Sequence, residues 1–505
     1  MSPFKKTISF DFIQKIVLAI ILTLAFSTCA VAVENKSITQ KSFVFGGAEH
    51  DYGSGIAVVD EHHLIVAGNS SSGDFENIAN TERIGSNGKS DIFIALISRK
   101  EHAITKLLII GGDDDDFLKN ICLDQDGNLY LTGSTFSQNF PSKQKYGDLS
   151  KKDKTNVFLI KTSALLEGPT LSITFGGEGF DYPGAIAVAS DGIYVGGNTS
   201  SANFPVTVGS HRIKFNSTKY GKVSYGQDVF LTKFDLTLSY ISASTFLGGD
   251  ADEFVNDIKI SDNSEVIVAG TTHSQNFPRS EETYVLEIRP GGVKTFIATL
   301  PSDLSKIGKS MVLETTNQLY VKAMAIAPDK SIWITGYLSK GIFPFHLNTF
   351  PYTENTIGEA YGGGGYDSFL IHFKEDLTDI ISASYLGGNN NEFAQAIAVS
   401  PQGNIIVGGF TDSFGTFPVT FNYNDRLNFG HYDTFITEFS SDLTKIYKST
   451  LSGGSGYDYI YRIVLNDNAL FALGNTTSKN IEATYINKTG NKKNKNAVYF
   501  QSFEN

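Results

Sequence analysis

Carboxylates recur at one position of an internal repeat and form the most regular polar feature of the sequence. The six residues are Asp51, Asp116, Asp181, Glu253, Glu392 and Asp458. Carboxylate oxygens gathered in a ring suit a hard cation such as Ca²⁺. The alternative is structural, because each carboxylate can accept hydrogen bonds from backbone N–H groups of the Gly-Gly turn that precedes it. Repetition in nearly every unit favours the structural alternative.

A denser acidic run, Asp113, Asp114, Asp115 and Asp116, is the better local candidate for a metal site. Four acids in one turn predict Ca²⁺ as the ion, with a solvated acidic loop as the competing interpretation. No other cofactor is indicated, since the sequence has neither zinc-ligand spacing nor a phosphate-binding glycine loop followed by a helix.

Three charged residues stand where the other repeats have small or apolar side chains. Lys259 replaces a small residue and follows Asp257 by two positions, and Arg462 lies at a similar place in the last repeat. Charges inside a strand are costly unless they are paired or face water. We predict an internal ion pair here, and these residues are the first candidates for a pocket. Cys122 occupies a slot that is Ala in other repeats, which predicts a buried thiol and not a nucleophile.

Five tyrosines mark the two longest loops, which cover 198–227 and 337–366. They are Tyr220, Tyr225, Tyr352, Tyr361 and Tyr366. Exposed tyrosine suits contacts with proteins or glycans, because its ring is apolar and its hydroxyl is polar. Strand alternation places these loops on the face of the Gly-Gly turns, so we predict a binding surface there.

The elements that position these residues are short strands in a repeat of about 65 to 73 residues. A Gly-Gly pair recurs at 46, 111, 176, 248, 387 and 453, and alignment of the flanking residues places a degenerate seventh anchor at 314. After each anchor come an acid, an aromatic residue and alternating apolar residues, then three further strand patterns separated by polar turns. Four antiparallel strands in seven units predict an all-β chain forming a single seven-bladed β-propeller.

The two ends of the repeat region complement each other. Residues 41–45 read as a fourth strand with no first three, and the last unit has a third strand at 497–503 with no fourth. We predict that the N-terminal strand completes the last blade and closes the ring, which removes exposed strand edges.

Residues 1–32 are expected to be a secretory signal peptide, and residues 33–505 the propeller. Lysines precede an apolar run over 16–26, and Ala30-Val31-Ala32 has the small-x-small pattern of a cleavage site. The apolar run is too short for a membrane span. We expect export to the periplasm, cell surface or medium, and a monomer without a membrane span after cleavage. Lipidation at Cys29 is the less favoured alternative, because Thr28 is a poor neighbour for it.

The repeat resembles the bacterial seven-bladed β-propeller repeat (SBBP-type) family over nearly the whole mature chain. The resemblance rests on Gly-Gly, the acid-aromatic pair, Ala396-Ile397-Ala398-Val399, Phe-Pro, Asp-x-Phe and Ser-Ala-Ser-Tyr-Leu-Gly-Gly. It implies a secreted or envelope-associated bacterial protein and carries over no catalytic residue.

We therefore expect a non-enzymatic binding or structural module that engages an envelope protein or polysaccharide through its long-loop face. The alternative is a hydrolase or lyase that uses a divalent cation at the channel mouth. A formal charge of −12 argues against nucleic acid as the partner, because phosphate binding needs a basic surface.

Overall fold

A computed structural model describes residues 39–78, 80–150, 153–216, 226–284, 293–340, 350–413, 415–420, 430–466, 469–481, 483–485 and 495–504. The predicted signal peptide and the candidate residues Tyr220 and Tyr225 lie outside these ranges. Within the ranges, no helix has the length and apolar character needed to cross a membrane.

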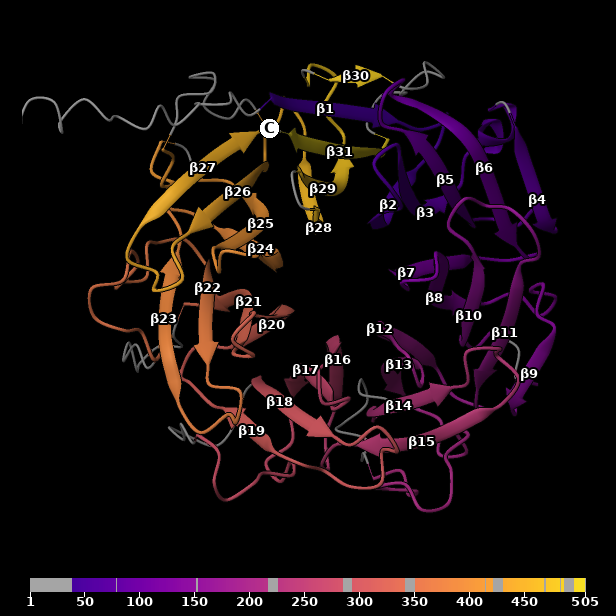
Figure 1. The fold of residues 1–505 in the computed structure, drawn as a ribbon, viewed down its shortest axis with the longest axis horizontal. Helices are drawn as coiled ribbons and strands as arrows, with labels where there is room; N and C mark the ends of the chain where they lie inside the picture. Colours follow the sequence, from indigo (N-terminus) through magenta and orange to yellow (C-terminus); the bar gives the residue numbers. More distant parts are fainter. Residues whose placement is uncertain are drawn as a thin grey trace, which may run out of the picture.

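Seven antiparallel sheets stand around one axis, which confirms the predicted seven-bladed propeller (Figure 1). Blade 1 contains β2 (Asp51–Val58), β3 (His63–Ser70), the 3₁₀ helix η1 (Gly73–Asn77), β4 (Thr81–Gly85), β5 (Asp91–Ser98) and β6 (Ala103–Gly111). Blade 2 contains β7 (Asp116–Leu123), β8 (Asn128–Thr135), β9 (Gln144–Gly147), β10 (Asn156–Ser163) and β11 (Leu171–Gly176). Blade 3 contains β12 (Asp181–Ala189), β13 (Gly192–Thr199), β14 (Asp228–Phe234) and β15 (Ile241–Leu247).

The remaining blades continue the ring in chain order. Blade 4 contains β16 (Glu253–Ile260), β17 (Val266–Thr272), β18 (Lys294–Leu300) and β19 (Ser310–Leu313). Blade 5 contains β20 (Leu319–Ile326), β21 (Ile332–Ser339), β22 (Tyr366–Phe373) and β23 (Ile380–Leu386). Blade 6 contains β24 (Glu392–Val399), β25 (Ile405–Thr411), β26 (Asp433–Phe439) and β27 (Ile446–Ser452).

Blade 7 joins the two ends of the chain, as the sequence predicts. It contains β28 (Asp458–Asn466), β29 (Ala469–Thr476), β30 (Thr484–Tyr485), β31 (Ala497–Glu504) and β1 (Thr39–Phe45). Strand β1 pairs antiparallel with β31 over seven residue pairs, from Thr39 opposite Glu504 to Phe45 opposite Val498. The ring is therefore closed by hydrogen bonds between the first and last described strands.

The hydrophobic core consists of one layer in each seam between neighbouring blades. Leucine, isoleucine, valine and phenylalanine alternate along every strand, so each sheet has an apolar face toward both neighbours. The smallest of these layers lies between blades 6 and 7 and is formed by Ile406, Ile436, Ile460, Ala472 and Phe503.

Every innermost strand has a β-bulge at the same place. In blade 6 the register with β25 shifts between Ala394 and Ala396, so Gln395 is left without a partner in the ladder. Opposite the bulge stands a glycine, Gly409, because a Cβ there would overlap the carbonyl oxygen of Phe393. The same overlap would occur in all the other blades, at Gly68, Gly133, Gly197, Gly270, Gly336 and Gly474. This explains why the second strand of each blade has a glycine opposite the bulge.

The long segment after the second strand of each blade returns along the blade's outer edge, which corrects the expectation that it forms loops on one face. In blade 1, β4 pairs parallel with β6 over five residues. In blade 3 the N–H of Thr207 donates to the carbonyl of Ser244, and in blade 5 that of Thr353 donates to Ala383. The physical reason is that the fourth strand would otherwise expose unpaired N–H and C=O groups.

Candidate functional site

The repeated carboxylates are structural latches between blades, which confirms the structural alternative. In each of the six units, the carboxylate accepts a hydrogen bond of 2.6–3.1 Å from the N–H of the second glycine of its own Gly-Gly turn. In blade 3, Asp181 also accepts from the hydroxyls of Thr199 at 2.5 Å and Ser201 at 3.1 Å. All six side chains are fully buried, so they are not accessible to a ligand.

Burial controls the protonation of these latches. It raises the pKa of Asp51, Asp116 and Asp181 to about 6 and that of Glu253 to about 7, although the hydrogen bonds act in the opposite direction. A second buried acid lies beside the latch in several seams. Asp433 is an example, because burial and the charge of Asp458 raise its pKa to about 8.

The fifth unit, which lacks both Gly-Gly and the acid, uses an ion pair in place of the latch. Lys294 Nζ lies 3.4 Å from Glu314 Oε2, and both residues are buried. Leu319 fills the position of the acid and is also buried. This pair stands at the anchor that the alignment places at residue 314.

The four acids of the run in blade 2 contact different partners. Asp116 is a latch, Asp114 forms an ion pair with Lys89 at 2.6 Å, and the Asp113 N–H donates to Asn139. Asp115 donates its N–H to the Asp114 carboxylate. Within the ranges described above, no group of three or more His, Cys, Asp or Glu residues is placed to hold a metal ion.

The central channel is the space enclosed by the seven innermost strands, and each of these strands has one bulged residue. The seven bulged residues are Ser54, Lys119, Gly184, Asn256, Lys322, Gln395 and Tyr461. Four of them, from blades 2 to 5, line one cavity of about 450 Å³. A bulge re-aims a side chain without disturbing the rest of the ladder, so the bulges of blades 2, 4 and 5 bring Lys119, Asn256 and Lys322 to this cavity.

An arc of aromatic side chains extends from this cavity along blades 5, 6 and 7. Nine of its rings form a chain of contacts, in which the ring centroids lie 4.7–5.8 Å apart along the main path. The aromatic arc consists of Tyr320, Tyr337, Tyr366, Phe393, Phe410, Tyr432, Tyr457, Tyr459 and Tyr461. Every member keeps part of its surface exposed.

Strand register assembles the arc. Tyr320 lies opposite Tyr337 in blade 5, and Phe393 lies opposite Phe410 in blade 6. Aromatic cross-strand pairs of this kind stabilise a sheet while keeping their rings on one surface. Tyr366 and Tyr457 are the most exposed members, at 36% and 37%.

Of the three singled-out tyrosines within the described ranges, Tyr366 alone belongs to the aromatic arc. Tyr361 packs against the core, with its ring 6.2 Å from that of Tyr385. Tyr352 is 45% exposed and lies next to Thr353, which pairs with the outermost strand of blade 5. The structure thus separates these three residues, while Tyr220 and Tyr225 lie outside the described ranges.

The predicted ion pair is confirmed for blade 4. Lys259 Nζ lies 2.8 Å from Asp257 Oδ1, and Asp257 also accepts the Met324 N–H of the next blade at 2.9 Å. Arg462 has a different role, because it donates to the carbonyls of Tyr461 at 3.0 Å and Lys119 at 3.2 Å. It reaches Lys119 of blade 2 from blade 7, across the innermost strand of blade 1, which has glycines at 53 and 55.

The cavity of about 450 Å³ combines aromatic and cationic groups. Tyr182, Phe254, Tyr320 and Tyr337 line it together with Lys119, Lys322 and His273. Its volume is within the range of small-ligand sites. One end of the aromatic arc and two amino groups therefore face the same space.

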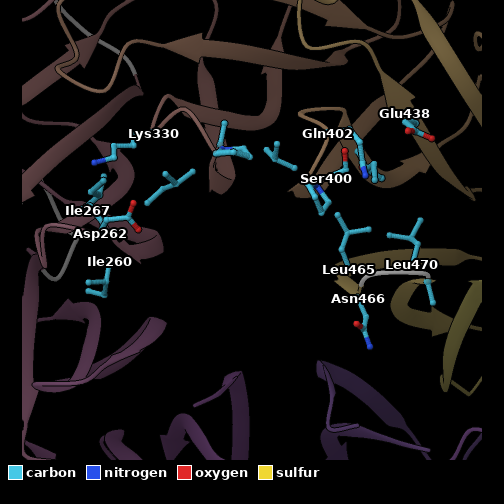
Figure 2. Close-up of a pocket in the computed structure, with 18 of the residues that line it drawn as sticks. Ile260, Asp262, Ile267, Lys330, Ser400, Gln402, Glu438, Leu465, Asn466 and Leu470 are labelled. Carbon is cyan, nitrogen blue, oxygen red and sulfur yellow. The ribbon is translucent and has the colours of Figure 1, made fainter. Parts of the chain in front are cut away.

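The opposite mouth of the channel has a different chemistry. A cavity of about 680 Å³ lies there, lined by the last residues of the innermost strands of blades 4 to 7. Figure 2 shows aliphatic side chains such as Ile260 and Leu465 along its walls, with the charged residues Asp262, Lys330 and Glu438 among them. It extends toward Phe503 in the thinly packed seam between blades 6 and 7.

Part of the aromatic arc is visible in the sequence, but the repeat pattern alone does not identify it. An aromatic residue follows the acid position in all seven units, but only units 5 and 6 also have one directly after the second-strand glycine, at Tyr337 and Phe410. Lys119 and Lys322 share one repeat position, eight residues after the anchor. That position is the bulge.

Several solved structures align with most of this chain at low sequence identity. No curated protein matches the sequence. A protein of unknown function from Dyadobacter fermentans aligns with a TM-score of 0.43 and 6% identity, over 93% of this chain and 99% of its own. The WD40 β-propeller domain of Doa1 gives a TM-score of 0.41 at 10% identity, with coverages of 92% and 97%. Hydrazine synthase from Kuenenia stuttgartiensis gives 0.42 at 10%, with coverages of 88% and 95%.

One segment has a direct family match. Residues 105–141, which run from β6 through β7 and β8, match the beta-propeller repeat named SBBP. The chain is thus a seven-bladed β-propeller that carries an SBBP beta-propeller repeat.

Proposed function

We propose that this propeller is a non-enzymatic binding module that holds a glycan against the aromatic arc. The partially exposed, continuous arc is the observation that carries the proposal. Sugar rings present C–H groups on one face, and aromatic rings attract them through their negative faces. The tyrosine hydroxyls at the ring edges add hydrogen bonds to sugar hydroxyls.

The rigidity of the frame supports binding over an extended surface. The arc spans three blades that are fixed by aromatic cross-strand pairs and by buried latches, so little ordering is needed when a ligand binds. Because the six repeated carboxylates are buried in hydrogen bonds within the fold, the arc and not these acids supplies the contact chemistry.

The proposal places the protein outside the cytoplasm, where envelope glycans occur. The support for this is the expected signal peptide at residues 1–32, with its lysines, apolar run and Ala30-Val31-Ala32. Detection of the chain without these residues in a periplasmic or culture fraction tests this part of the proposal separately.

A glycan array probed with the full chain tests the binding function, followed by calorimetry on the best ligand. The variants Tyr457→Ala and Tyr366→Ala remove the two most exposed rings of the arc. We expect each to weaken binding about tenfold, as for a central aromatic contact. Tyr447→Ala is the matched control, because Tyr447 is 52% exposed on the outer strand of blade 6.

The outcomes separate clearly. Loss of affinity in the arc variants with normal affinity in the control supports the proposal. Equal binding by all three variants contradicts the assignment to the arc, and absence of binding to every glycan contradicts the function. Release of new reducing ends from a bound glycan contradicts the non-enzymatic part.

A further inference from the structure

The innermost strands carry more cationic than anionic side chains besides the buried latch acids, although the protein as a whole is acidic. Apart from the buried latch acids, the seven innermost strands carry four cationic side chains and one carboxylate. These are Lys119, Lys259, Lys322, Arg462 and Asp257. The whole chain has a formal charge of −12, so this local excess of cations is opposite in sign to the rest of the molecule.

Two of the cations face the cavity at the aromatic mouth. Lys119 and Lys322 are bulged residues from blades 2 and 5, and both line the cavity of about 450 Å³. Neither forms an ion pair with a carboxylate of the described residues. The amino nitrogen of Lys322 lies over the ring of Tyr337, 5.2 Å from the ring centroid.

Arg462 adds a further positive charge close to Lys119. Arg462 donates hydrogen bonds to two backbone carbonyls, and its Nε has no partner among the described residues. The pKa of Lys119 is lowered to about 8, first because the channel walls desolvate the amino group and then because Arg462 and Lys322 are positive. Lys119 and Lys322 form no ion pair with a carboxylate of the described residues, and an anion placed between cations lowers the cost of holding them close together.

We propose that this cavity binds the acid group of an anionic glycan, with Lys119 and Lys322 as the charge partners and Tyr320 and Tyr337 as stacking surfaces for the adjoining sugar rings. The inference rests on the glycan-binding function proposed above and specifies its ligand class. Lysine ammonium groups act as compact point charges, which suits carboxylate and sulfate groups equally. Arg462 contributes its charge, and two of its N–H groups are held by the backbone carbonyls of Tyr461 and Lys119.

Matched acidic and neutral oligosaccharides provide the test, with the full chain in a calorimeter at low salt. The first pair is tetragalacturonate and its full methyl ester, and the second is a sulfated galactose tetramer and its desulfated form. We expect one acidic member to bind at least about tenfold more tightly than its neutral counterpart, since hydrogen bonds to charged groups are stronger than neutral ones. Raising the salt concentration should weaken the acidic ligand selectively.

Variants assign the effect to the cavity. Lys119→Met, Lys322→Met and the double variant remove charge while keeping the aliphatic stem. We expect the double variant to bind the acidic oligosaccharide only as tightly as it binds the neutral one. Lys374→Met is the control, since Lys374 lies at the exposed turn after β22 and pairs with Asp379 at 3.1 Å.

The failures of the two proposals are distinguishable. If neutral and acidic members bind equally, or the double variant keeps the preference, the anionic-ligand inference is overturned while glycan binding stands. If no glycan binds, both fall. Inorganic sulfate is titrated alone as a further arm, and an affinity equal to that of the tetramer shows a small-ion site and overturns the glycan inference.

Discussion

Closure of the ring through β1 can be tested by removing two phenylalanine side chains from it. Phe45 is completely buried and Phe43 is 2% exposed. Phe43 stacks on Phe500 with centroids 4.7 Å apart, and Phe45 meets Phe93 of blade 1 edge-on at 5.9 Å. The strand therefore fills the seam between blades 7 and 1 as well as completing a sheet.

The expected magnitude follows from these contacts. Replacing a buried phenylalanine by alanine costs about 3–5 kcal/mol, from lost burial and the cavity left behind. Phe45→Ala should therefore lower the free energy of unfolding by about that amount. Phe43→Ala combined with Phe45→Ala should lower it by about 6–10 kcal/mol, which is comparable with the entire stability of a typical domain, about 5–15 kcal/mol.

Urea unfolding followed by far-UV circular dichroism measures these changes. The single variant should keep one cooperative transition at a lower midpoint, and a chain without residues 39–45 should have no cooperative transition. Ile381→Ala serves as the control, because Ile381 is 46% exposed on the outer strand of blade 5. A truncated protein with the midpoint and slope of the intact chain would refute the closure.

Two further outcomes are expected. Gly409→Ala should lower the free energy of unfolding by about 1–3 kcal/mol, because the new Cβ would overlap the Phe393 carbonyl oxygen. Gly73→Ala is the control, because Gly73 has open space around it. Equal urea midpoints for the two variants would contradict the role of Gly409. The pKa of Asp433 is about 8 in the fold against 3.8 for the free side chain. Between these values the native state retains a proton that the unfolded chain loses. The free energy of unfolding therefore falls as the pH rises from about 4 to about 8. Asp433→Asn should remove that part of the slope in urea titrations at several pH values, and parallel profiles for the variant and the wild type would contradict it.

The architecture was accessible from the sequence because it repeats. Glycine anchors, acid positions and alternating apolar residues recur in each unit, and the missing strands at the two ends complement each other. Even the irregular fifth unit is placed correctly by alignment at residue 314, where Glu314 and Lys294 replace the usual latch with an ion pair. Repetition averages out local ambiguity in a way that a single strand pattern cannot.

The candidate site was less accessible because it depends on where the repeats differ. Long polar segments predict exposed loops, but unpaired strand edges recruit them as outer-edge strands such as β4. The aromatic arc needs the register of Tyr337 and Phe410 with neighbouring blades, which spacing alone does not give. Lys119 is an ordinary lysine in the sequence, and only the bulge directs it into the channel.

Because every blade has the same bulge, the residues at the bulged positions can differ from blade to blade. Each bulged residue stands outside its ladder, so its side chain can change without altering the hydrogen-bond register. Gly184 is the exception, because a Cβ there would lie 2.2 Å from the carbonyl oxygen of Val255. Serine, lysine, glycine, asparagine, glutamine and tyrosine already occupy these positions on one scaffold. Related chains or designed libraries can therefore change ligand preference through the other six bulged positions while inheriting an unchanged fold.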